Sequence, residues 1–136
     1  MALFKNSIGP AGWLHRRGSV AIEYALILPA LLMLVFGIID TGRVMWTYTT
    51  LYRATEAAAR CAAINTVDCA TDAQVQNRAV AEAWGLAIDA SAFTITAAAC
   101  GHEVKGAYDF QFIIPLMNTP LGTVTLRATA CYPANT

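Results

Sequence analysis

The pattern of apolar residues divides the chain into one long apolar run, a helical stretch and a series of alternating stretches. Residues 19–39 read SVAIEYALILPALLMLVFGII, and Glu23 is the only charged residue among them. A helix of this length spans about 30 Å, which matches the thickness of a bilayer core. The run therefore predicts a single membrane-spanning helix near the N-terminus.

The helical period continues beyond the apolar run to about Ile64. Residues at three- and four-residue steps predict one apolar stripe along this part of the helix. Arg53, Glu56 and Arg60 share another face, and their spacing is typical of a solvated helix face. The stripe consists of Val44, Tyr48, Leu51, Thr55, Ala58 and Ala62, with Met45, Tyr52 and Ala59 beside it.

A short helix and three strands are predicted after this long helix. Thr71 and Gln74 form the pattern of a capping box, and the apolar period continues to about Trp84, where Gly85 can cap the helix. Apolar and polar residues then alternate in three stretches, which predicts a small antiparallel sheet with one face packed on the helices. The stretches are residues 93–97, 103–114 and 123–130.

Two connections join these stretches. Gly101 and His102 are predicted to form the first turn. Residues 115–122, PLMNTPLG, form the second connection, and its prolines keep that edge out of the hydrogen-bonded ladder. This connection is unusually apolar for a loop, so core filling and contact with a partner both stay open as explanations.

Composition and charge restrict the class of protein. The 136 residues fit one compact domain; 57% of them are hydrophobic and only 13% are charged, against roughly 25% charged in ordinary soluble domains. Residues 1–18 hold three basic and no acidic side chains, whereas residues 19–136 hold six basic and nine acidic ones. This balance excludes disorder and argues against a nucleic-acid partner. The basic N-terminal flank predicts a cytoplasmic N-terminus and an extracytoplasmic C-terminal part.

Four cysteines follow the predicted span, in what is then an oxidising compartment. Two disulfides are the simplest account, with three possible connectivities, and we favour Cys61–Cys69 and Cys100–Cys131. In a simple meander the first and third strands lie about 9–10 Å apart, beyond disulfide reach. Either the last strand pairs beside the first, or Cys100 and Cys131 lie past the strand ends.

The sequence contains no pattern typical of an active site. His15 lies in the basic N-terminal stretch and His102 near a turn, so neither suits a catalytic triad. The cysteine spacings and the two histidines do not support a zinc site, and there is no phosphate-binding glycine loop. We therefore expect no enzyme activity, no metal, no cofactor and no small-molecule substrate.

The carboxylate of Glu23 inside the apolar run needs a physical reason. A charged side chain at the centre of a membrane helix costs about 2.5–3.5 kcal/mol. Two interpretations stay open: the side chain reaches the lipid headgroups, or it meets a positive partner in the membrane or in an assembly. Pro29 interrupts the hydrogen bonding of the same run and predicts a local kink.

The segment from Arg16 to Arg43 reads RRGSVAIEYALILPALLMLVFGIIDTGR. It resembles the N-terminus of TadE-like pseudopilins of the tight-adherence (Tad, or Flp-type) pilus, a branch of the type IV pilin superfamily. The similarity is strongest from residue 16 to about residue 64. The family pattern is a basic leader ending in glycine, a glutamate at the fifth mature position, then an aromatic residue and a proline; these are Gly18, Glu23, Tyr24 and Pro29.

The resemblance implies a pilin-like fold built on the long N-terminal membrane-spanning helix. Together with the short second helix, the three-stranded antiparallel sheet and the two disulfides that the residue patterns predict, this gives an α+β fold. The resemblance also implies cleavage between Gly18 and Ser19 by a prepilin peptidase on the cytoplasmic face of a bacterial inner membrane. Residues 1–18 are then a removed cytoplasmic leader, residues 19–40 the transmembrane part and residues 41–136 an extracytoplasmic domain. Many type IV pilins begin the mature chain with Phe, where this chain has Ser19.

The resemblance further implies that Glu23, beside Tyr24, pairs with the freed α-amine of a neighbouring subunit. The expected function is that of a minor pilin or pseudopilin in pilus assembly, either in the inner membrane or incorporated into an extracellular pilus. The expected partners are the prepilin peptidase, other pilin subunits, an inner-membrane assembly platform and membrane lipid. The alternative is a permanently anchored single-pass envelope protein whose disulfide-stabilised ectodomain binds a partner.

Overall fold

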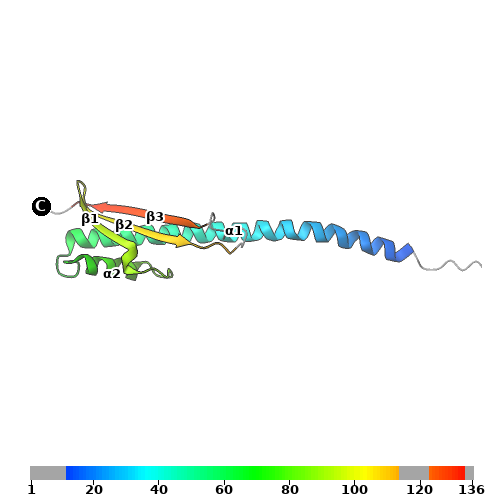
Figure 1. The fold of residues 1–136 in the computed structure, drawn as a ribbon, viewed down its shortest axis with the longest axis horizontal. Coiled ribbons are helices and arrows are strands. Elements are labelled where there is room, and N and C mark those ends of the chain that lie inside the picture. Colours follow the sequence, from blue (N-terminus) through cyan, green and yellow to red (C-terminus); the bar gives the residue numbers. More distant parts are fainter. Residues whose placement is uncertain (1–11, 114–122, 134–136) are drawn as a thin grey trace, which may run out of the picture. The chain divides into compact units, whose positions relative to one another are not determined.

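The computed structural model describes residues 12–113 and 123–133, with side chains from Val20 onward. The chain divides into two units, Met1–Gly37 and Ile38–Thr136. The predicted α+β fold is confirmed, with a long helix, a short helix and a three-stranded sheet (Figure 1). In chain order the elements are α1 (Gly12–Ile64), α2 (Asp72–Glu82), the 3-10 turn η1 (Ala90–Ala92), β1 (Phe93–Ala98), β2 (Gly101–Phe110) and β3 (Val124–Tyr132).

Helix α1 ends at Ile64 in a turn closed by a disulfide. The side-chain oxygen of Asn65 accepts hydrogen bonds from the backbone N–H groups of Val67 and Asp68, at 3.1 and 3.0 Å. The predicted Cys61–Cys69 bond joins the last turn of the helix to the end of this loop, with the two Cα atoms 5.8 Å apart. The reversal after α1 is therefore fixed both by hydrogen bonds and covalently.

The face of α1 that packs on the rest of the Ile38–Thr136 unit is made of small residues. Ala54, Ala58 and Ala59 are at most 1% exposed and lie in the core cluster with Leu51. The predicted stripe is right for Leu51 and its buried neighbours at positions 55, 58 and 59.

The same prediction is wrong for three bulky residues. Met45, Tyr48 and Tyr52 are 61%, 44% and 43% exposed. Because each residue turns the helix by about 100°, Met45 and Tyr52 lie on the side opposite Ala54. Three- and four-residue spacing alone did not distinguish these two sides.

Helix α2 begins with the predicted capping box. The Thr71 hydroxyl accepts a hydrogen bond from the Gln74 backbone N–H, and the Gln74 side chain accepts one from the Thr71 backbone N–H. These bonds satisfy donors that the first turn of a helix leaves unpaired. Gly85 follows the helix with a φ of +82°, a left-handed conformation that favours glycine.

The sheet is an antiparallel meander in the order β1-β2-β3. Its inner face contributes Phe93, Val104 and Ala128 to the core. The first turn lies at Ala99–Cys100 rather than at the predicted Gly101–His102, because His102 already pairs with Ala97 in the ladder. The second strand ends at Phe110, four residues before the predicted end.

The outer face of the sheet is polar, as its alternation predicts. Lys105 and Thr96 both donate to the Glu103 carboxylate, at 2.8 and 3.2 Å. The hydrogen bond from Lys105, with a smaller contribution from Thr96, holds the pKa of Glu103 below its ordinary value. Thr125 donates to Asp109 at 2.6 Å. These exposed pairs indicate a solvated surface.

The Cys100–Cys131 pairing is confirmed, and the meander does not prevent it. Cys100 lies in the turn beyond the end of β1, and its Cα is 6.3 Å from that of Cys131. The second of the two alternatives is therefore right for Cys100 and wrong for Cys131, which lies inside β3 and pairs with Glu103 in the ladder. The bond ties the β1–β2 turn to the last residues of β3.

Residues 115–122, the connection predicted to contact either the core or a partner, lie outside the described residues. Both explanations for the apolar character of this connection therefore stay predictions.

Gly106 lies in β2 at a point where the sheet packs closely against α1. A Cβ built there is 2.9 Å from Phe93 Cε1, 3.0 Å from Thr55 Cγ2 and 3.1 Å from Leu51 Cδ1. All three neighbours are almost fully buried, so they have little room to move. The absence of a side chain at Gly106 therefore lets the sheet lie close against the helix.

We predict that Gly106→Ala lowers the free energy of unfolding by about 1–3 kcal/mol, because the added methyl overpacks this contact. Thermal unfolding of the full chain in detergent, followed by circular dichroism, measures the effect. Gly42→Ala in α1 is the matched control, since a Cβ there meets nothing within 4 Å. That variant is expected to be unchanged or slightly more stable. An unchanged melting temperature for Gly106→Ala would contradict the close-packing argument.

Candidate functional site

The first candidate site is the apolar surface of the Met1–Gly37 unit. Every side chain from Val20 to Phe36 is exposed, and almost all of these side chains are apolar. Among the residues described, α1 is the one helix long and apolar enough to cross a membrane. Exposing this much apolar surface to water is unfavourable by about 25 cal/mol per Å². The segment therefore requires an apolar environment on all sides.

Glu23 lies on this surface with its side chain exposed. Its neighbours in the chain are the apolar Ile22 and the aromatic Tyr24, which are 65% and 67% exposed. Within the described part of the chain no ion pair or hydrogen bond is formed by its carboxylate. The pairing of Glu23 with a neighbouring subunit is not tested by a single chain and stays a prediction.

The other motif residues also lie in α1. The backbone of Gly18 and Ser19 is helical, so the predicted scissile bond lies within the helix rather than before it. The helix continues through Pro29. The cleavage and the kink at Pro29 both stay predictions.

The second candidate site is the point where α1 meets the end of β2. Asp40, directly after the apolar run, is only 3% exposed. Its two carboxylate oxygens accept hydrogen bonds from the backbone N–H of Ile113, at 3.2 and 3.1 Å. A buried carboxylate is unfavourable unless it is paired, and this contact joins residues 73 positions apart in sequence.

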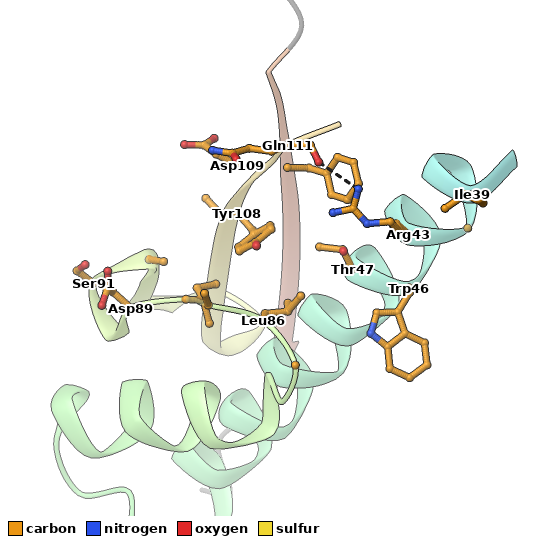
Figure 2. Close-up of a pocket in the computed structure, with 17 residues that line it drawn as sticks. Ile39, Arg43, Trp46, Thr47, Leu86, Asp89, Ser91, Tyr108, Asp109 and Gln111 are labelled. Atoms are coloured by element: carbon orange, nitrogen blue, oxygen red, sulfur yellow. Dashed lines mark hydrogen bonds between the residues drawn. The ribbon is translucent and has the colours of Figure 1, made fainter. Parts of the chain in front are cut away.

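Arg43 completes this junction from the next turn of α1. Its guanidinium lies 2.9 Å from the Asp40 carboxylate and 3.4 Å from the Gln111 backbone oxygen, to which it donates. It also lies over the Phe110 ring, 5.0 Å from the centroid. Figure 2 shows Arg43 reaching from α1 toward Gln111. We call Asp40, Arg43 and the Ile113 backbone the junction clamp.

A groove of about 910 Å³ opens beside the junction clamp, between α1, the segment before β1 and β2. Tyr108 and Leu86 point into it, whereas Trp46 points away (Figure 2). Trp46 instead packs edge-on against Trp84, with ring centroids 5.5 Å apart. No group of three metal-ligating side chains forms among the described residues. The contacts of the junction clamp hold the segment after β2 against α1, which is a structural role.

The junction clamp was missed by the sequence interpretation, which ended the transmembrane part at residue 40 and gave Asp40 and Arg43 no structural role. A signal was present, because a carboxylate directly after an apolar run with an arginine three residues later needs a partner in a packed domain. The identity of that partner, the Ile113 backbone, is a long-range contact that no local pattern contains.

We predict that Asp40→Ala lowers the free energy of unfolding of the Ile38–Thr136 unit by about 1–3 kcal/mol, because the Ile113 N–H and the Arg43 guanidinium lose their acceptor. Hydrogen exchange of the Ile113 amide in the full chain measures the loosening directly. Asp109→Ala is the matched control, since that exposed carboxylate accepts a hydrogen bond from the exposed Thr125 side chain; the change is expected to alter stability by less than about 0.5 kcal/mol. Unchanged protection at Ile113 would contradict the role of Asp40.

The comparisons with known proteins agree with the sequence motif. The family model described as TadE-like protein matches residues 18–60, so the match begins at Gly18 and includes Glu23, Tyr24 and Pro29. No curated protein and no solved structure matches the chain. Residues 18–60 are thus similar to the TadE-like family, and the predicted resemblance is confirmed for this part of the chain.

Proposed function

We propose that this protein is a minor pilin or pseudopilin that takes part in assembly of a Tad pilus. The observation that carries the proposal is the TadE-like match at residues 18–60, which contains the glycine, glutamate and proline of the motif in order. The exposed apolar surface of α1 supports it, because a pilin-like subunit needs such a surface first in lipid and then among other subunits. The role is structural, and we expect no catalytic activity.

The chain is processed between Gly18 and Ser19 by a prepilin peptidase at the cytoplasmic face. Both residues lie within α1, so the helix must open locally before the bond can enter a protease. Glycine favours such opening, because in a helix interior it is about 0.8–1.0 kcal/mol less favourable than alanine. Cleavage removes residues 1–18 with their three basic side chains and leaves a new α-amine on Ser19.

Glu23 then pairs with the Ser19 amine of a neighbouring subunit. Its exposed carboxylate is available on the apolar surface, where a second charge of opposite sign neutralises it in a low-dielectric environment. Removing one partner from a buried pair costs about 3–5 kcal/mol. The pair therefore selects one axial position for each subunit relative to the next. Other pilin subunits and an inner-membrane assembly platform are the partners on this proposal.

On this proposal, residues 19–40 span the inner membrane and residues 41–136 lie outside the cytoplasm. Both disulfides, Cys61–Cys69 and Cys100–Cys131, lie after the span in sequence. Disulfides persist in oxidising compartments and are rare in the cytosol. The two bonds therefore support an extracytoplasmic domain and a cytoplasmic N-terminus.

A permanently anchored envelope protein is the second candidate. It shares the helix, the topology and the disulfides, but its chain retains residues 1–18. The N-terminal residue of the chain purified from its native membrane separates the two candidates: Ser19 supports the pilin and Met1 the anchor.

We predict that Gly18→Glu blocks maturation, because a charged side chain replaces the residue before the scissile bond. Intact-mass measurement is expected to show a species heavier than the mature wild-type chain by the 18 leader residues. Gly9→Glu is the control, since it adds the same charge to the leader away from the cleavage site, and it is expected to mature normally. If Gly18→Glu still yields a chain that begins at Ser19, the processing proposal is wrong.

We predict that Glu23→Ala is cleaved and inserted normally but is absent from the pilus assembly, because the loss of about 3–5 kcal/mol removes its pairing. N-terminal sequencing checks cleavage, and immunoblots of membranes and of sheared pili check insertion and incorporation. Glu56→Ala, which removes an exposed glutamate from the same helix beyond the span, is the control. Normal incorporation of Glu23→Ala would favour the interpretation in which the carboxylate only reaches the headgroups.

A further inference from the structure

Three large apolar side chains are exposed around the junction clamp. Ile39 of α1 is 44% exposed, Ile113 after β2 is 50% exposed and Val124 at the start of β3 is 43% exposed. They come from three separate segments, so no single helix stripe or strand alternation accounts for them. We call these three residues the junction rim.

Hydrogen bonding and strand pairing fix the level of the junction rim along α1. Ile113 donates its N–H to Asp40, the residue that directly follows Ile39. Val124 is the register partner of Phe110, and the Phe110 ring lies under the Arg43 guanidinium. The rim therefore lies between the end of the apolar run and the next turn of the helix.

This level coincides with the headgroup layer of a bilayer. A bilayer of about 40–45 Å has a hydrocarbon core of about 30 Å, which leaves about 5–7 Å of headgroups on each side. Arg43 lies four residues, or about 6 Å, beyond Ile39. The Arg43 side chain is 44% exposed, and arginine is well suited to bind a phosphate oxygen. The Trp46 backbone lies seven residues, or about 10 Å, beyond Ile39 along the helix axis.

We propose that the junction rim is a lipid-contact surface: Ile39, Ile113 and Val124 lie in the headgroup layer of the membrane that α1 spans, and Arg43 contacts lipid phosphate there. The inference rests on the membrane-anchored topology of the proposed function. Because the Asp40 carboxylate is buried against Ile113, it does not present an unpaired negative charge to the headgroups.

Lipid fits this surface better than a protein partner. Ile39 is both a member of the rim and the last residue of the apolar run, so a bilayer surface at Ile39 is also next to Ile113, which bonds to Asp40. Three separated side chains are few for a stable protein interface, which buries at least about 1,000 Å² and about 20–30 residues on each side. A partly exposed cation beside apolar side chains matches the chemistry of the headgroup layer.

The test uses the full chain without substitutions, one molecule in each lipid nanodisc of phosphatidylethanolamine and phosphatidylglycerol, with labelled isoleucine, leucine and valine methyl groups. Paramagnetic relaxation is measured in three samples, with a spin label on the lipid headgroup, a label deep in the acyl chain or a water-soluble label. Val67 is the matched control, because it is an apolar residue of the same domain that is 79% exposed and follows the far end of α1. Leu28, inside the apolar run, reports on the span itself.

The proposal expects the headgroup label to broaden the Ile113 and Val124 methyl signals several-fold more than those of Val67. The water-soluble label is expected to broaden the Val67 methyl signals more than those of Ile113 and Val124. If Ile113 and Val124 respond as Val67 does while Leu28 responds to the deep label, the span exists and the rim proposal is wrong. If both rim residues are shielded from water without responding to the headgroup label, protein covers them and the lipid assignment is overturned. If Leu28 does not respond to the deep label, the membrane-anchored topology itself fails.

Discussion

The fold of the Ile38–Thr136 unit depends on close packing between a helix and a sheet. Alanines on α1 and Gly106 on β2 remove side-chain volume from the contact, and Phe93, Val104 and Leu51 fill what remains. Protein interiors are packed so closely that the addition of a single methyl group at such a contact changes stability. The small residues of the helix therefore determine how near the strands can lie, while the larger ones only fill the remaining space.

The two parts of α1 illustrate how the environment determines the apolar pattern. Around Leu28 apolar residues occupy all sides of the helix, which is the pattern of a helix surrounded by an apolar environment. After Asp40 one side is buried by protein, and the opposite side carries Met45 and Tyr52. The junction clamp lies just after the end of the apolar run, where the buried Asp40 carboxylate pairs with the partly exposed Arg43.

The sequence predicted local features well and long-range ones less well. The capping box at Thr71, the strand alternation and the cysteine pairing depend on near neighbours or on topology, and all three are confirmed. The inward side of α1 was partly wrong, because aromatic residues such as Tyr48 satisfy a helical period equally well when they face outward. In the candidate site, the motif at Gly18 and Glu23 was recognisable because it is contiguous. The Asp40–Ile113 contact was not, because the partner is a backbone group that carries no sequence signal.

The Cys100–Cys131 bond has a consequence for how the protein responds to proteolysis. Its sulfurs join residues 31 positions apart, on either side of β2 and most of β3. A protease that cuts one peptide bond anywhere between them leaves two pieces that stay covalently joined and share one sheet. A cut in the connection between β2 and β3 therefore releases no fragment, and the nicked chain stays covalently joined as long as the disulfide is oxidised.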